Sequence, residues 1–182
     1  MKHPLAALIT LSLSTVTLAG CPLFPQPVES VDLERYTGLW YQVAGYPFGP
    51  SANLVGITAE YELLEGGRIR VINAGFEGDF DGPVDIIEGT ATVVDTRTNA
   101  RLAVGFGPFS FERSRLGNYW IIDLDTDEYQ WAVVTDPLRF TLFILAREPA
   151  LDEEILDGIF ERLEAQGFDL DRVVLIPQEL PE

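Results

Sequence analysis

Gly38-Leu39-Trp40-Tyr41 opens a strand-like run that extends to Tyr46, and this stretch decides the fold of the chain. A glycine that leaves room for a tryptophan to plug the end of a sheet, followed by alternating residues, is how a closed β-barrel begins. Further strand-like runs follow, separated by turn residues, before one long helical pattern near the C-terminus. The stretch therefore predicts the first strand of an all-β protein.

Eight runs rich in β-branched and aromatic residues predict strands, because Gly, Pro, Asn or Asp flanks most of them. Eight neighbouring antiparallel strands joined by short turns predict an up-and-down barrel, which removes exposed sheet edges by closure. An apolar stripe over 152–166, stopped by Gly167, predicts one C-terminal α-helix that packs outside the barrel. The predicted strands are Leu39–Tyr46, Val55–Leu64, Arg68–Phe76, Asp85–Asp95, Arg101–Phe106, Asn118–Asp125, Tyr129–Thr135 and Phe140–Arg147.

The pattern of polarity assigns an inner and an outer face to most strands, since side chains alternate across a strand. Several inward positions carry small residues, among them Ala59, Gly89 and Ala91. A barrel of eight strands is just wide enough for one small ligand, so small inward residues favour a cavity; a barrel filled by side chains is the alternative. The predicted ligand-binding residues are Ile57, Ala59, Asn73, Phe106, Tyr119, Val134 and Phe143.

Alternate connections between the strands meet at one end of such a barrel and form its mouth. The connection 107–117 brings Phe109, Phe111, Arg113 and Arg115 to this rim. An aromatic rim above an apolar cavity suits an amphipathic ligand, and an arginine can hold a phosphate or carboxylate through paired N–H donors. The alternative is that these arginines only balance nearby acids on the surface.

The order of the motifs resembles that of the lipocalin family. A Gly38-Leu39-Trp40-Tyr41 start, the stretch Asp127-Glu128-Tyr129-Gln130-Trp131-Ala132, a last strand ending in Arg147 and one helix follow each other as in the bacterial outer-membrane lipocalins related to apolipoprotein D. The resemblance covers residues 31–177. It implies that Arg147 packs over Trp40, beside Gly38, and seals the floor, a cation–π contact of about 1–2 kcal/mol. It also implies a ligand such as a fatty acid or lysophospholipid, whereas the alternation alone predicts only an apolar, elongated molecule.

The N-terminus predicts export. Residues 1–20 have a small polar start and a mostly apolar run, which is typical of a secretory signal peptide. The end of this segment, Leu18-Ala19-Gly20-Cys21, resembles the bacterial lipoprotein box, which implies acylation of Cys21. With Pro22 next, the resemblance implies anchoring in the outer membrane. Ordinary cleavage near Ala19, with a free thiol on Cys21, is the alternative. Residues 21–30 then form a proline-stiffened tether, and residues 31–182 the barrel domain.

Charge and composition exclude several classes of function. The chain has 12 basic and 29 acidic residues, a net charge of −17, and loss of Lys2 with the signal leaves 11 against 29, or −18. Nucleic-acid binding is therefore not expected. His3 is the only histidine and Cys21 the only cysteine, which excludes catalytic Ser-His-Asp and Cys-His sets, histidine-bound metals and haem from the mature domain.

Once histidine and cysteine are excluded, carboxylates remain as the candidate catalytic groups. Asp79, Asp81 and Asp123 are candidates for acid–base catalysis on a lipid-like substrate. Asp125-Thr126-Asp127 hints at calcium but lacks the glycine and distal glutamate of a helix-loop-helix site, so no metal or cofactor is predicted. We therefore predict a membrane-anchored lipid-binding protein that is not an enzyme, with a carboxylate enzyme and a filled, structural barrel as alternatives. A homodimer is compatible with the sequence.

Overall fold

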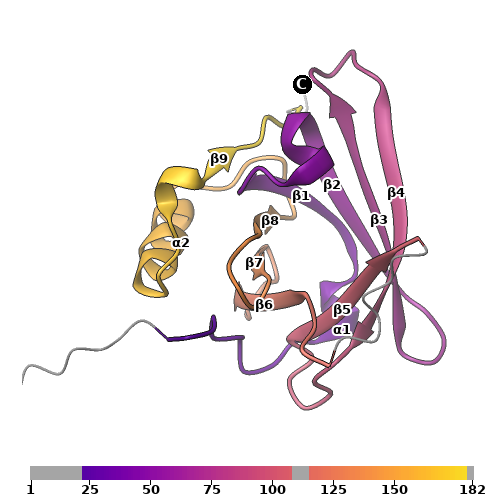
Figure 1. Ribbon diagram of the computed structural model, residues 1–182, viewed down its shortest axis with the longest axis vertical. Helices are drawn as coiled ribbons and strands as arrows, with labels where there is room; N and C mark the ends of the chain where they lie inside the picture. Colours follow the sequence, from indigo (N-terminus) through magenta and orange to yellow (C-terminus); the bar gives the residue numbers. More distant parts are fainter. Residues whose placement is uncertain (1–21, 108–114, 180–182) are drawn as a thin grey trace, which may run out of the picture.

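The computed structural model describes residues 22–107 and 115–179, and it confirms a closed antiparallel barrel of eight strands with a helix outside (Figure 1). Each strand pairs with the next along the chain, and β8 pairs back with β1. The strands are β1 (Gly38–Gly45), β2 (Leu54–Leu63), β3 (Arg68–Glu77), β4 (Val84–Val93), β5 (Arg101–Phe106), β6 (Tyr119–Leu124), β7 (Trp131–Thr135), β8 (Leu142–Ala146) and the short β9 (Val174–Leu175).

The eight barrel strands begin and end within two residues of their predicted bounds. The start of β7 explains one of the largest differences between a predicted and an observed strand end. Tyr129 adopts a left-handed backbone with φ 57°, so it belongs to the turn and the strand starts only at Trp131. Its hydroxyl accepts a hydrogen bond from the Asp32 backbone N–H (2.9 Å), which holds the turn against the N-terminal segment.

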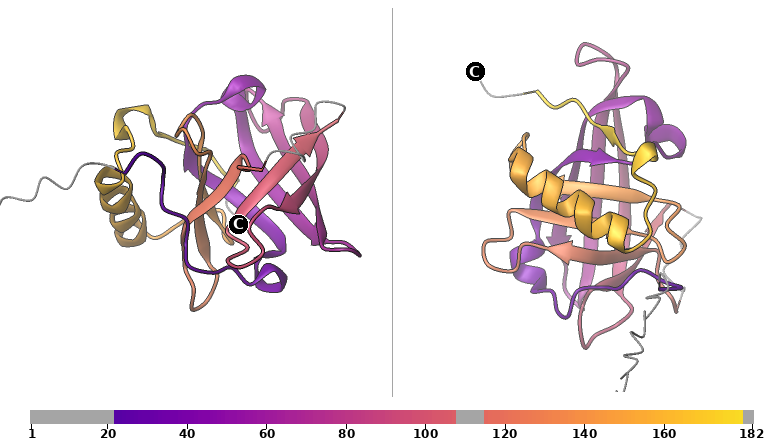
Figure 2. Two further views of the ribbon diagram at one scale, coloured as in Figure 1. Left: turned by 60° about the horizontal axis from the view of Figure 1, so that its bottom comes forward. Right: turned by 90° about the vertical axis from the view of Figure 1, so that its left-hand side faces the viewer.

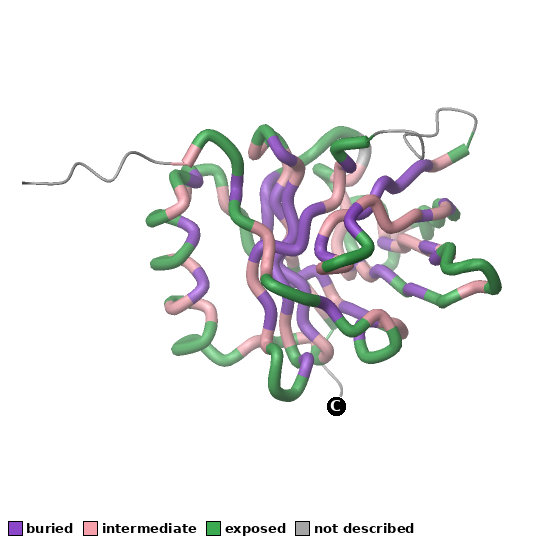
Figure 3. Tube along the Cα trace, turned by 90° about the horizontal axis from the view of Figure 1, so that it is seen from below, coloured by how far each residue is buried: buried purple, intermediate pink, exposed green. Residues whose placement is uncertain are grey.

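Helix α2 (Glu153–Ala165) lies across the outside of the barrel, as the right-hand view of Figure 2 shows. Asp152 caps its first turn, and Ile159 and Leu163 are fully buried beneath it. The molecule thus has two apolar layers, one inside the barrel and one between the sheet and α2. In Figure 3 the buried positions follow the strands and the inner side of this helix, whereas most turns are exposed.

The C-terminal segment closes a seam at the mouth of the barrel. β1 pairs with β2 only from Gly38 to Tyr41, and beyond this point β9 pairs with β1 instead. The carbonyl of Pro177 accepts a bond from the Gly56 N–H (2.8 Å). The Gln178 amide donates to the carbonyls of Gln42 (2.8 Å) and Ile57 (3.2 Å), so one side chain bridges β1 and β2.

The N-terminal segment runs along the barrel before the first strand. Residues 22–30, which the sequence suggests as a tether, contact the domain: Pro25 is fully buried and the Val28 N–H donates to the Ile121 carbonyl (3.0 Å). It leads into the short helix α1 (Leu33–Tyr36), capped by Asp32, which crosses the closed end. In the described ranges no helix is long and apolar enough to cross a membrane.

Candidate ligand-binding barrel interior

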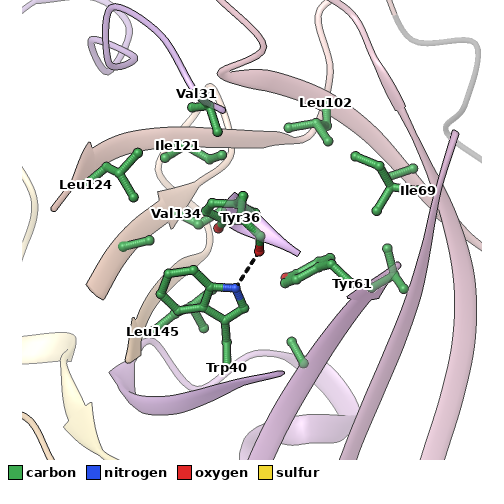
Figure 4. Close-up of a cluster of buried hydrophobic side chains, with 14 of the residues drawn as sticks. Val31, Tyr36, Trp40, Tyr61, Ile69, Leu102, Ile121, Leu124, Val134 and Leu145 are labelled. Carbon is green, nitrogen blue, oxygen red and sulfur yellow. Dashed lines mark hydrogen bonds between the residues drawn. The ribbon is translucent and has the colours of Figure 1, made fainter. Parts of the chain in front are cut away.

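The floor of the barrel is sealed by Trp40 and Arg147. The indole is fully buried, and the Arg147 guanidinium carbon lies 3.7 Å from the centroid of its ring. Arg147 also donates to the carbonyls of Leu39 (2.7 Å), Arg35 (2.7 Å) and Thr37 (2.9 Å). The indole N–H donates to the Tyr36 carbonyl over 2.8 Å (Figure 4). Burial lowers the pKa of Arg147, and its guanidinium joins residues 35–40 to the end of β8.

Gly38 makes the floor contact sterically feasible. Its φ is +92°, a left-handed backbone that residues with a side chain rarely adopt. A Cβ at this position would also lie 3.4 Å from Nη1 of Arg147. The three residues that the sequence assigns to the floor therefore lie together, and the glycine lets the arginine approach the backbone of β1.

Three tyrosine hydroxyls lie directly above the floor. The Tyr119 hydroxyl is 2.8 Å from that of Tyr36 and 2.9 Å from that of Tyr61. Burial raises the pKa of Tyr61 to about 12 and the pKa values of Tyr36 and Tyr119 well above the usual 10. We call this group the tyrosine cluster. Sequence reasoning selected Tyr119 as a ligand-binding residue but missed the cluster, because Tyr36 reaches it from the helix before the first strand.

The floor half of the interior is packed. The cavity beside the tyrosine cluster measures about 10 Å³, roughly the space that one water molecule needs. The alternative of a filled barrel therefore describes this half well. Its walls are mostly aliphatic and come from helix α1 and from strands β2 to β6: Leu33, Tyr36, Thr37, Tyr61, Ile69, Ala91, Leu102, Val104 and Tyr119.

The mouth half is open to solvent. Along β4 the inward side chains change from Ala91, which is 1% exposed, to Ile87, which is 48% exposed. The same gradient runs from Val71 to Asn73 on β3 and from Val104 to Phe106 on β5. An inward apolar side chain that water reaches marks a space above the packed floor. The interior is thus a shallow cup rather than a deep one.

The predicted ligand-binding residues lie at two depths. Ala59 and Val134 are buried in the interior cluster, and Phe106, Tyr119 and Phe143 pack against it while only partly buried. Asn73 is half-buried between Ala59 and Ile87 of the neighbouring strands, whereas Ile57 is buried beside a bulge in β2 and outside the interior cluster.

One inward residue has to be glycine for Phe106 to fit. A Cβ on Gly89 would lie 2.6 Å from the Phe106 ring and 2.5 Å from the Gly105 carbonyl oxygen. The two residues are paired across β4 and β5, so the ring occupies the space that a side chain at position 89 would fill. The small inward glycine that suggested a cavity is therefore partly filled by its neighbour.

Of the predicted rim residues only Arg115 belongs to the described part of the chain, where it is exposed; Phe109, Phe111 and Arg113 lie outside it. The mouth carries two other arginines that sequence reasoning did not select. Arg139 lies in the connection between β7 and β8, and Arg172 follows α2. Nothing in their local sequence marks them, because α2 and the N-terminal segment bring their neighbours from far along the chain.

The carboxylates proposed for catalysis have structural partners. Asp123 pairs with Arg162 of α2 (2.6 Å), and Asp79 accepts a bond from the Asp81 N–H (3.1 Å). Asp125 accepts bonds from the backbone of the β6–β7 turn. Within residues 22–107 and 115–179, His, Cys, Asp and Glu form no group of three that could hold a metal ion.

A closed antiparallel barrel with a plugged floor, an open mouth and an outer helix defines a calyx, a class of cup-shaped β-barrel proteins. The chain belongs to the lipocalin family, because the sequence model of the family described as the lipocalin-like domain matches residues 31–178.

Similar proteins support this assignment. The chain is 34% identical to the outer membrane lipoprotein Blc of Vibrio cholerae, over 94% of this chain and 98% of that one. It is 29% identical to apolipoprotein D of Cavia porcellus, over 87% and 82% of the two chains. Among solved structures, lobster apocrustacyanin A1 shares the fold with a TM-score of 0.60 at 16% identity, over 86% and 92%.

Proposed function

We propose that this protein is a membrane-anchored lipid carrier that holds one amphiphile, such as a fatty acid or lysophospholipid, in the mouth half of its barrel. The observation that carries the proposal is the inward-facing apolar wall formed by Ile87, which is exposed, and by Phe106 and Phe143, which are only partly buried. An acyl chain placed there removes apolar surface from water, which contributes roughly 25 cal/mol per Å². The packed floor below limits the length of chain that enters.

The proposed location is the outer membrane, through acyl groups on Cys21. The lipoprotein box at Leu18-Ala19-Gly20-Cys21 supports this, and so does the name outer membrane lipoprotein that the Vibrio cholerae relative bears. Two acyl chains on one residue suffice for stable anchoring in a membrane, whereas a single chain does not. Cys21 lies outside the described residues.

Position 87 tests the proposed binding site. Replacing Ile87 with tryptophan adds bulk on the inner wall and is expected to weaken binding of a fluorescent C16 fatty acid at least about tenfold, or 1.4 kcal/mol. The adjacent Ile86 provides the matched control: it is 64% exposed and faces outward, so Ile86→Trp should leave affinity unchanged. Fluorescence titration gives both dissociation constants, and thermal unfolding shows whether each variant is folded. Equal affinity in the two variants would place the ligand elsewhere.

Asn73 favours a ligand that carries a hydrogen-bonding group. Its Oδ1 is buried and has no hydrogen-bond partner within the described residues, which costs about 1–3 kcal/mol in an apolar interior. A hydroxyl group can act as donor or acceptor, so a ligand with a hydroxyl near its headgroup satisfies this amide in either orientation. Free lysophospholipids carry such a group, which favours them over plain fatty acids.

The variant Asn73→Leu tests whether Asn73 binds the glycerol hydroxyl of a lysophospholipid. The variant should be more stable without ligand by about 1 kcal/mol, because an unpaired buried polar atom is removed. It should also bind a lysophosphatidylethanolamine more weakly, but bind the analogue methylated at the glycerol hydroxyl as the unmodified protein does. Calorimetric titration of both lipids measures the difference. A variant that still prefers the free hydroxyl would show that Asn73 does not contact it.

A further inference from the structure

The chain enters the described structure at the mouth of the barrel. Arg139, in the connection after β7, donates to the carbonyls of Pro22 (2.8 Å) and Leu23 (3.3 Å), and its Nε donates to the Gln166 carbonyl (3.1 Å). The N-terminal segment, this connection and the end of α2 therefore meet on one side of the molecule (Figure 2). The described part of the chain therefore begins beside the rim, at Pro22.

Exposed apolar side chains lie at this end of the barrel. Leu23 is 83% exposed, Leu138 58%, Phe140 63% and Leu175 67%. Arg139 lies between Leu138 and Phe140, and the Arg172 guanidinium donates to the Phe140 carbonyl (3.4 Å). We call the four apolar residues the rim patch. Four such side chains gathered at one end of the molecule mark an interaction surface rather than scattered surface residues.

Both arginines and aspartates lie beside the rim patch: Arg139, Arg172, Asp136, Asp169 and Asp171. Within the described residues neither Arg139 nor Arg172 pairs with a carboxylate; their partners are carbonyl groups and the rings of Phe168 (5.6 Å) and Tyr46 (4.0 Å). A chain with 29 acidic residues is repelled by anionic lipid over most of its surface. Arg139 and Arg172 keep N–H donors that their printed hydrogen bonds do not use, and such donors bind lipid phosphates.

Two other places with exposed apolar residues also carry acids. A surface groove beside the floor is lined by Leu63 with Glu34, Glu60 and Glu62, and its one arginine, Arg70, already pairs with Glu62 and Glu88. On the outer face of β4, Val84 and Ile86 adjoin a connection that contains Asp79 and Asp81. A bilayer surface that carries anionic lipid disfavours both places.

We infer that the protein docks mouth-first on the lipid bilayer, with the rim patch in the headgroup region and Arg139 and Arg172 against lipid phosphates. The inference rests on the acyl anchor of the proposed function, because Pro22, the residue after the proposed acylation site, accepts a hydrogen bond from Arg139 at this rim. In this orientation the open half of the cup faces the membrane, and an amphiphile moves between bilayer and barrel with its acyl chain shielded from water.

Two labelled variants of the acylated protein test the orientation. Asp171→Cys places a thiol beside Arg172 at the rim, and Glu65→Cys places one in the exposed turn between β2 and β3 at the floor end; each removes one acid. Both are labelled with a bimane dye in vesicles of phosphatidylethanolamine and phosphatidylglycerol that contain brominated lipid. We expect the rim label to be quenched at least about twofold more than the floor label. Equal quenching, or stronger quenching at the floor, overturns the inference.

Separate measurements test the acyl anchor and the contact between the rim patch and lipid. If residue 21 is not acylated, its thiol takes up label in the unsubstituted protein, which refutes the anchor without testing ligand binding. In the acylated protein, Phe140→Glu should remove at least half of the difference in quenching, whereas Leu63→Glu at the floor should leave it unchanged. Ligand affinity measured in detergent should be the same in both. Equal effects of the two glutamates would show that the rim patch does not contact lipid.

Discussion

Replacing Trp40 with alanine is expected to lower the free energy of unfolding by about 3–5 kcal/mol, the usual cost of truncating a buried aromatic residue. The indole is fully buried, its N–H bonds to the Tyr36 carbonyl, and Arg147 lies 3.7 Å from the ring centroid. Alanine leaves a cavity, an unpaired carbonyl and a guanidinium without its aromatic partner. Urea unfolding followed by circular dichroism measures the loss.

The neighbouring position supplies the control for this prediction. Leu39→Ala changes a side chain that is 43% exposed and lies outside both buried apolar clusters, so it should cost less than about 1 kcal/mol. Arg147→Met keeps the bulk above the ring but removes the donors to the carbonyls of Arg35, Thr37 and Leu39, and should fall between the two. A Trp40→Ala variant as stable as Leu39→Ala would mean that the floor plug does not stabilise the barrel.

The sequence predicted the barrel well, because the information lies within each strand. Alternation along β3 marks Ile69 and Val71 as inward residues, and both are buried. Turn residues such as Gly66 and Gly67 mark the strand ends, where both adopt positive φ. The apolar stripe of α2 was predicted too, although Ile155 at its edge is exposed and only Ile159 and Leu163 are fully buried.

The depth of the cup could not be predicted, because it depends on contacts between distant residues. The tyrosine cluster joins positions 36, 61 and 119, and no local pattern brings their hydroxyls together. Gly89 looks like free space in the sequence, yet the ring of Phe106 lies over it. The packing of Pro25 and the bridge made by Gln178 likewise depend on elements that are remote in sequence. The tyrosine cluster and the Phe106 ring make the interior smaller than alternation alone suggests.

The tyrosine cluster predicts a loss of stability in alkali. In the unfolded chain each tyrosine titrates near pH 10, whereas burial raises the pKa of Tyr61 to about 12 and those of Tyr36 and Tyr119 well above 10. A raised pKa in the folded state stabilises the fold fully below pH 10, and this stabilisation is lost as the pH rises through the folded pKa. Tyr61 alone should therefore contribute a loss of about 3 kcal/mol between roughly pH 10 and 12.

Removing all three hydroxyls at once isolates this effect. The triple variant Tyr36→Phe, Tyr61→Phe and Tyr119→Phe leaves no hydroxyl of the cluster without its partner, so its stability at pH 8 should stay near that of the unsubstituted protein. Its urea midpoint should then fall much less between pH 10 and 12. Tyr41→Phe, a single change outside the cluster, should keep the full alkaline fall. Parallel curves for the triple variant and the unsubstituted protein would show that the cluster ionises without opposing the fold, and that water reaches the floor of the cup.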